Sequence, residues 1–296
     1  MRDFDENNIT AAVIDRFAET PDPRLKQVVQ SLVRHLHDFV RDVDLSFEEW
    51  QHAIDYLTRT GQMCTDKRQE FILLSDTLGI SMLVDAVNHR MPAGTTETTV
   101  LGPFYVAEPP EQAAGADVSG GATGEPLLVS GTVAAADGTP IADAIVDIWQ
   151  ADAEGYYDVQ RAELDGAQLR ARFRTDAAGK FSFRTIMPSF YPIPDDGPVG
   201  EMLKATNRHP NRPAHVHFMI GAEGYETLIT HVFAADSPYL DSDAVFGVKN
   251  SLIAEFVRHP PGEKDGRLIP VPFRTLHYDF GLKQSSPRTR AVAKSS

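Results

Sequence analysis

The spacing of the apolar residues changes about a third of the way along the chain, and this change limits what the chain can fold into. In the first part, apolar residues recur at the three- and four-residue intervals of amphipathic helices. One stripe runs from Leu25 to Val40, and Ser46 with Glu49 forms a helix-capping pattern before the next apolar face. We therefore predict an all-helical region over residues 1–97, which serves as a scaffold or subunit contact.

The second part consists of short apolar or alternating runs, separated by glycine, proline and Asp-Gly turn signals. This texture is typical of short antiparallel strands, so residues 98–283 are predicted to form an antiparallel β-sandwich, and the chain is of the α+β class. Residues 109–126 are predicted to be a long surface loop, and residues 284–296 a disordered tail. The expected strands include "LLVSGTV", "AIVDIW", "FSFRTIM", "HVHFMI" and "TLITHVF".

The charge and cysteine content exclude several classes of partner and site. The chain has 28 Lys and Arg against 42 Asp and Glu, a net charge of −14, which predicts neither nucleic acid nor an anionic membrane as partner. A single cysteine, Cys64, allows no intrachain disulfide and no cluster of thiolate ligands. The first residues resemble no signal peptide, and we expect a cytoplasmic protein.

Two His-x-His pairs occur in the chain, and their surroundings give them different meanings. His35 and His37 lie in the first helical stripe, where residues two apart are separated by about 200° around the axis. His215 and His217, in "RPAHVHFMIG", lie in a strand-like run, where residues two apart share a face. The strand pair can converge on one metal ion, and Met219 continues its face.

The residues alone leave this strand pair open between a metal site and two packed histidines. The chain has no H-E-x-x-H motif and no aspartate adjacent to the pair, so zinc-hydrolase and facial-triad patterns are unsupported. A divalent-metal hydrolase that uses the pair with carboxylates is a weaker alternative. Tyr156, Tyr157 and Tyr191 stand in turn segments, but their spacing does not select them as ligands.

Several longer stretches resemble the intradiol ring-cleavage dioxygenases, in their catechol 1,2-dioxygenase branch. The resemblance covers most of the chain, and "LGPFY", "EGYYDVQ" and the histidine of "LITHVF" are most similar to the members that cleave hydroxyquinol. It implies that the β-sandwich is the catalytic domain. The other stretches that carry it are "VSGTVAAADGTPIADAIVDIWQADAEGYY", "PSFYPIPDDGPVGEMLKA" and "RHPNRPAHVHFMIGAEGYETLITHVF".

The resemblance also implies a ligand set and three catalytic residues. An Fe(III) ion is expected to be held by Tyr157, Tyr191, His215 and His217. Tyr191 is the ligand expected to leave when the substrate binds, and Arg212 is expected beside the substrate ring, where its charge stabilises carbanion character. His231 stands where many catechol 1,2-dioxygenases have glutamine. Without the resemblance, Arg212 would be interpreted as an exposed arginine before Pro213.

By the same resemblance the substrate is a small aromatic diol or triol, and O2 is the second reactant. We expect hydroxyquinol (1,2,4-trihydroxybenzene) to be cleaved to 3-hydroxy-cis,cis-muconate, or maleylacetate. Asp76 can accept a hydrogen bond from the extra ring hydroxyl, or it can be a solvated or helix-capping residue. The matched pocket residues are Leu73, Asp76, Val100, Leu101, Gly102, Pro103, Phe104, Ile193, Pro194 and Val245.

The resemblance further implies a homodimer formed through the N-terminal helices, with a phospholipid bound at the dimer interface. The alternatives within the class are catechol and chlorocatechol as substrates. An alternative of another class is a non-catalytic β-sandwich binding module, and the four matched ligand positions argue against it.

Overall fold

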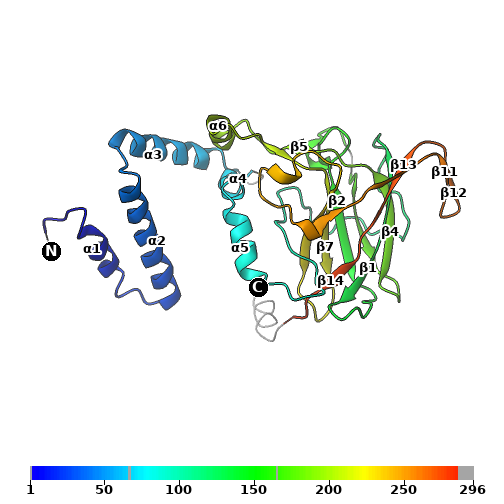
Figure 1. The fold of residues 1–296 in the computed structure, drawn as a ribbon, viewed down its shortest axis with the longest axis horizontal. Helices are drawn as coiled ribbons and strands as arrows, with labels where there is room; N and C mark the ends of the chain where they lie inside the picture. The colour runs from blue at the N-terminus through cyan, green and yellow to red at the C-terminus, as the bar shows by residue number, and fades with distance from the viewer. Residues whose placement is uncertain (1, 66–67, 165, 286–296) are drawn as a thin grey trace. The chain divides into compact units, whose positions relative to one another are not determined.

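A computed structural model describes residues 2–65, 68–164 and 166–285 (Figure 1). The predicted tail therefore lies outside the described residues, except for Gln284 and Ser285. The chain divides into two compact units, Met1–Gln62 and Met63–Ser296. Within the described ranges, no helix combines the length and the apolar character that crossing a bilayer requires.

The first unit contains three helices: α1 (Ile9–Arg16), α2 (Pro23–Asp42) and α3 (Phe47–Gln62). The predicted capping pattern is confirmed: Glu49 N donates to Ser46 Oγ at 3.2 Å, and Ser46 N donates to Glu49 Oε2 at 2.9 Å. Asp22 caps the start of α2, and its side chain accepts hydrogen bonds from two backbone N–H groups. Its apolar stripe is about half exposed over Leu25, Val28, Leu32, Leu36, Phe39 and Val40.

Two further helices, α4 (Glu70–Thr77) and α5 (Ile80–Asn88), belong to the second unit. Gly79 separates them with a φ of 73°, a conformation that glycine adopts without strain. The buried carboxylate of Glu70 accepts hydrogen bonds from Arg68 and from the backbone of Val199, in α6 (Pro198–Ala205). These contacts fix α4 against the sandwich domain, while the boundary at residues 97 and 98 stays a prediction.

The sandwich consists of two five-stranded sheets (Figure 1). The pairs β1–β4, β2–β3, β2–β7, β7–β8 and β10–β13 are antiparallel, which confirms the predicted antiparallel sandwich; the pairs of β1 with β13 and β14, and of β8 with β9, are parallel. The first sheet has the order β3 (Arg170–Arg174), β2 (Ile145–Gln150), β7 (His215–Gly221), β8 (Leu228–Ala234), β9 (Ile253–Ala254). The second has the order β10 (Val257–His259), β13 (Phe273–His277), β1 (Pro126–Ala135), β14 (Phe280–Leu282), and β4 (Lys180–Ile186) also pairs with β1.

Shorter elements connect these sheets. Two small ladders join β5 (Tyr191–Pro192) to β6 (Asn211–Arg212) and β11 (Gly262–Lys264) to β12 (Arg267–Ile269). The β11–β12 hairpin projects from one end of the sandwich (Figure 1). Three 3-10 turns complete the description: η1 (Asp158–Gln160), η2 (Leu240–Ser242) and η3 (Asn250–Leu252).

The two-residue period of β7 divides its side chains between the core and the opposite face of the sheet. Val216, Phe218 and Ile220 are fully buried in the core between the two sheets, as predicted. His215 and His217 point to the other face. The functional residues therefore lie on the outer face of a sheet whose inner face holds the hydrophobic core.

The segment 109–126 is irregular and largely exposed up to the start of β1, as predicted for a surface loop, but it also pairs with both sheets. Gln112 N donates to Arg172 O on β3 at 2.8 Å, and Val118 N donates to Arg184 O on β4 at 2.9 Å. Val118 is buried in the core. The segment thus covers the open edges of both sheets, because their unpaired backbone groups need partners. Its glycines and alanines indicated a loop but carried no sign of this pairing.

Candidate metal centre and active site

The four side chains matched to metal ligands meet at one buried point. Tyr157 Oη lies 3.1 Å from Tyr191 Oη and 2.9 Å from His217 Nε2, and the Nε2 atoms of His217 and His215 are 3.1 Å apart. All four residues are at most 5% exposed. Ligands with bonds of about 2.1 Å to one ion lie roughly this far from each other. The donor atoms therefore fit a single metal ion.

The tautomer of His215 favours metal binding. Its Nδ1 lies 2.7 Å from the carbonyl oxygen of Pro213, and that carbonyl can only accept a hydrogen bond. The proton of a neutral ring is thus on Nδ1. The lone pair of Nε2 points to the place where the other candidate ligand atoms meet. A backbone carbonyl in this place is the kind of partner that orients metal-bound histidines in proteins.

Burial shifts the pKa values of the candidate ligand side chains in directions that bear on metal binding. Burial and the charge of Arg212 lower the pKa of His215 to about 3, and burial with the neighbouring histidines holds the pKa of His217 well below its usual value. Both rings are neutral at pH 7 and able to bind a metal. Burial and the nearby Tyr191 raise the pKa of Tyr157 well above its usual value. This phenol needs a strong positive charge nearby to ionise, such as that of a bound metal ion.

A tight turn places Tyr157. The carboxylate of Asp152 accepts hydrogen bonds from the backbone N–H groups of Glu154 and Tyr156 at 2.8 and 2.9 Å. Gly155 has a φ of 91°, and a Cβ there would lie 2.8 Å from the Cβ of Tyr191. The glycine of the Gly-x-Tyr stretch is therefore needed both for its backbone conformation and for the close approach of the second tyrosine.

Strand register brings the remaining residues of the site together. Tyr191 on β5 pairs directly with Arg212 on β6. His217 on β7 lies between Trp149 on β2 and His231 on β8, and the Trp149 ring stacks on it at a centroid distance of 4.5 Å. The sequence analysis did not select Trp149, although its alternation with the core residues of β2 places it on the same face.

His231 lies next to the matched ligands. Its ring centroid is 4.1 Å from that of His217, and its Nδ1 is 3.4 Å from Arg212 Nη2. His215, His217 and His231 form the one group of metal-capable histidines, cysteines and carboxylates within the described ranges. No carboxylate belongs to this group, so the carboxylate ligand that a divalent-metal hydrolase would need is missing from it.

The segment before the sandwich covers the metal centre. Phe104 stacks on Tyr157 with ring centroids 4.4 Å apart. Gly102 has a φ of 78°, and a Cβ there would lie 3.3 Å from His217 Cε1. Val100 is half-buried, whereas Leu101 and Pro103 are exposed. In the predicted pocket stretch 100–104, Gly102 and Phe104 therefore contact the site and shield it from water.

A small apolar cluster holds three of the other predicted pocket residues. Leu73 on α4 packs with Ile193 and Val245, which are separated from it by more than a hundred residues of chain. Pro194 is half-buried next to Ile193. The cluster has the apolar character that a pocket for an aromatic ring would need.

Asp76 and Arg212 are both buried, which excludes the solvent-exposed interpretation of each residue. Asp76 is 7% exposed, so it is not a solvated residue, and burial raises the pKa of its carboxyl. Arg212 is 3% exposed, so it is not a surface arginine. Its guanidinium forms an ion pair with Asp243, with Nε 3.1 Å from Oδ1. No sequence pattern pointed to Asp243, which lies in another loop.

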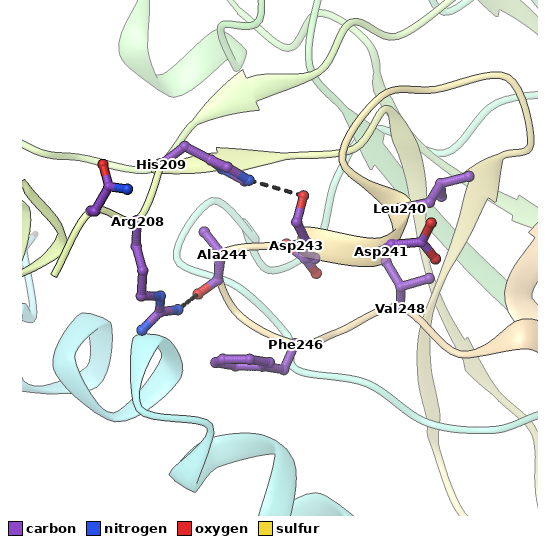
Figure 2. Close-up of a pocket in the computed structure, with 10 residues that line it drawn as sticks. Arg208, His209, Leu240, Asp241, Asp243, Ala244, Phe246 and Val248 are labelled. Carbon is purple, nitrogen blue, oxygen red and sulfur yellow. Dashed lines mark hydrogen bonds between the residues drawn. The ribbon is translucent and has the colours of Figure 1, made fainter.

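A cavity of about 440 Å³ lies beside this loop (Figure 2). Asp243 and Ala244 contribute to its lining, together with Arg208 and His209, whose Nε2 is 2.9 Å from Ser242 Oγ. Arg208 donates to the carbonyl oxygen of Ala244 at 3.1 Å (Figure 2). Of the described residues that line this cavity, none is a matched metal ligand. The cavity is thus separate from the metal centre.

The fold and the site define a class of enzyme, and comparison with known proteins agrees with it. Residues 100–284 match the family described as dioxygenase, and residues 22–96 match the catechol dioxygenase N terminus. The chain belongs to the intradiol ring-cleavage dioxygenase family and is an enzyme of that class. The alternative of a non-catalytic binding module is not supported.

Three of the similar proteins are named for hydroxyquinol substrates. The chain is 60% identical over 262 residues to a 6-chlorohydroxyquinol 1,2-dioxygenase of Cupriavidus pinatubonensis, covering 88% of this chain and 95% of the relative. It is 50% identical to a hydroxyquinol 1,2-dioxygenase of a Rhizobium species, covering 86% and 87%. The crystal structure of hydroxyquinol 1,2-dioxygenase from Pseudomonas putida superposes with a TM-score of 0.90 at 49% identity, covering 95% and 99%.

Proposed function

We propose that this enzyme uses Fe(III), held by Tyr157, Tyr191, His215 and His217, to cleave hydroxyquinol between its two adjacent hydroxylated carbons. One hydroxyquinol and one O2 give one 3-hydroxy-cis,cis-muconate, and both oxygen atoms of O2 enter the product. The observation that carries the proposal is the meeting of two phenol oxygens and two imidazole nitrogens, each within 3.1 Å of the next.

The mixed donor set supports the ferric oxidation state. Two phenolates are hard anionic donors, which offset much of a 3+ charge, whereas a site of neutral histidines alone favours a divalent ion. When bound, the ferric ion would act as a Lewis acid and template that chelates the two adjacent hydroxyls and activates the ring toward O2. The tyrosinate that leaves, Tyr191 in our proposal, can accept a proton from an incoming hydroxyl.

Arg212 supplies a fixed positive charge next to these ligands. Burial works against a charged guanidinium, but Asp243, Tyr191 and Tyr157 together outweigh it and keep the pKa of Arg212 above its usual value. The side chain is therefore charged at any pH at which the enzyme works. Its position opposite Tyr191 suits the stabilisation of negative charge that develops on the substrate ring.

Asp76 is the residue that we propose to favour hydroxyquinol over catechol. It is a buried carboxylate on α4, three residues after Leu73 of the apolar cluster, and both Arg212 and Asp243 are close enough to influence its pKa. A carboxylate here can accept a hydrogen bond from the third hydroxyl of hydroxyquinol. Catechol lacks that hydroxyl and would leave the buried carboxylate without this partner.

The experiment combines metal analysis with rates on several substrates. The purified protein should contain one iron per chain and be red-brown, because phenolate-to-Fe(III) charge transfer absorbs visible light. Oxygen uptake should be fastest with hydroxyquinol, and 6-chlorohydroxyquinol, catechol and chlorocatechol are the comparison substrates. A colourless protein without iron after iron-replete expression would overturn the metal assignment, and a faster rate with catechol or chlorocatechol would overturn the substrate.

The helical unit supports a second part of the proposal, a cytoplasmic homodimer that binds a phospholipid. Six large apolar side chains on α2 are 44–55% exposed, which is more apolar surface on one helix face than a monomer usually presents to water. Light scattering of the purified enzyme should give twice the chain mass, and lipid extraction with mass spectrometry should give a phospholipid. Leu36→Glu, in the middle of the stripe, should produce monomers, whereas Arg34→Glu on the same helix should not.

A further inference from the structure

The loop of Asp243 holds the guanidinium of Arg212. Two contacts join the pair: Arg212 Nε to Asp243 Oδ1 at 3.1 Å and Arg212 Nη2 to Oδ2 at 3.3 Å. Both residues are at most 5% exposed. A fork of this kind fixes the plane of the guanidinium as well as its position.

Backbone groups of the same loop make the carboxylate rigid. Gly247 N donates to Asp243 Oδ2 at 2.8 Å, and Val245 N donates to Oδ1 at 3.4 Å. The loop is attached to β6 because Ala244 N donates to the carbonyl oxygen of Asn211 at 3.1 Å. Burial would raise the pKa of Asp243, but the charge of Arg212 outweighs it, so the carboxylate is ionised.

The backbone packs closely around this ion pair. A Cβ on Gly247 would lie 2.9 Å from Arg212 Nη2 and 3.1 Å from Asp243 Oδ2. Any larger residue at this position would push on the guanidinium. The same Nη2 atom is 3.4 Å from His231 Nδ1, so one nitrogen of Arg212 is held between the loop and the third histidine of the site.

We propose that Asp243 is a positioning residue for ring cleavage, which acts by fixing the guanidinium of Arg212 against the substrate. It touches neither the metal ligands nor the reacting atoms, and its effect on the reaction passes through Arg212. The inference rests on the proposed function, because it takes Arg212 as the residue that stabilises charge on the ring.

A double-mutant cycle tests whether the effect of Asp243 on the rate depends on Arg212. Asp243→Asn turns one acceptor into an N–H group that faces Arg212 and removes the charge, and it should lower kcat for hydroxyquinol by roughly 10- to 100-fold, the range known for residues that orient a site. In the background of Arg212→Gln the same substitution should change kcat less than about twofold. Single-turnover product formation measures the slow variants.

Other readouts separate positioning from general damage. Asp243→Asn should keep its iron and its charge-transfer band, and KM should rise less than kcat falls. Asp243→Glu keeps the charge and should retain more activity than the asparagine variant. Asp241→Asn is the matched control, because Asp241 is an exposed carboxylate of the same loop. This control should keep the rate of the unmodified enzyme.

Gly247→Ala provides a second way to move Arg212, since it adds a methyl group and removes no charge. It should lower kcat when Arg212 is present and have little effect with Arg212→Gln. Equal losses with and without Arg212, for either substitution, would overturn the inference. So would a fully active Asp243→Asn enzyme. If the unmodified enzyme cleaves none of the substrates, the proposed function fails instead.

Discussion

The two His-x-His pairs have the same spacing but lie in different elements. On α2, His35 is exposed and His37 lies 3.0 Å from Thr10 Oγ1, a side chain of α1. On β7, His215 and His217 are buried with their Nε2 atoms 3.1 Å apart. The period of the element decides the difference, because two residues make a full repeat of a strand and about half a turn of a helix. A His-x-His pattern therefore has meaning only together with the element that carries it.

The largest effect should come from removing one histidine of the strand pair. His217→Ala should lose its iron and lower kcat/KM by more than about 100-fold, because even indirect partners of a metal ligand are worth 10- to 100-fold. His35→Ala, the matched change on the helix, should keep both iron and rate. Elemental analysis and oxygen uptake measure these quantities. Iron retained by the His217 variant would contradict the assignment of this ring as a ligand.

The next substitution tests the opposite face of the same strand. Phe218 is fully buried in the core, and Phe218→Ala should lower the free energy of unfolding by about 3–5 kcal/mol. Chemical denaturation measures this change. Protein that still folds should bind iron through His215 and His217. An iron-free but stably folded variant would show that the two faces of β7 are not independent.

A smaller effect is expected at the substrate pocket, where neither histidine pair takes part. Asp76→Ala should lower kcat/KM for hydroxyquinol by roughly 10-fold relative to catechol, the value of one hydrogen bond to a charged acceptor. The ratio of the two rates is the quantity to measure. Gln69→Ala is the control, because Gln69 is exposed at the start of the same helix and its side chain does not cap it. Equal losses on both substrates would remove Asp76 as a selectivity residue.

The smallest effect should come from the third histidine. His231 shares the outer face with the strand pair, but its Nδ1 makes only a 3.4 Å contact with Arg212. His231→Gln should keep its iron and lower kcat/KM less than about tenfold, since one long hydrogen bond is lost or replaced. Iron loss in this variant would make His231 a ligand and would extend the pair on β7 to a group of three.

Where one period of apolar residues dominated a segment, its secondary structure could be predicted from the local sequence. The helical stripe of α2, the capping residues of α3 and the alternation of β7 were all readable, because each depends on neighbours within one element. The edge pairing of residues 109–126 could not be read, because it depends on open strand edges elsewhere in the chain. Spacing placed His215 and His217 on one face of a strand and left their role open, and the two tyrosines were selected only through the family resemblance.

The sequence by itself determined that His215 and His217 share one face of a strand and that no thiolate cluster can complete a metal site. Only the tertiary structure decided which distant groups meet them. Tyr157 follows a turn, Tyr191 belongs to a two-residue ladder, and Asp243 lies 31 residues from the arginine it holds. Local periodicity fixes the direction of a side chain within its element, whereas the convergence of separate elements depends on packing across the whole domain.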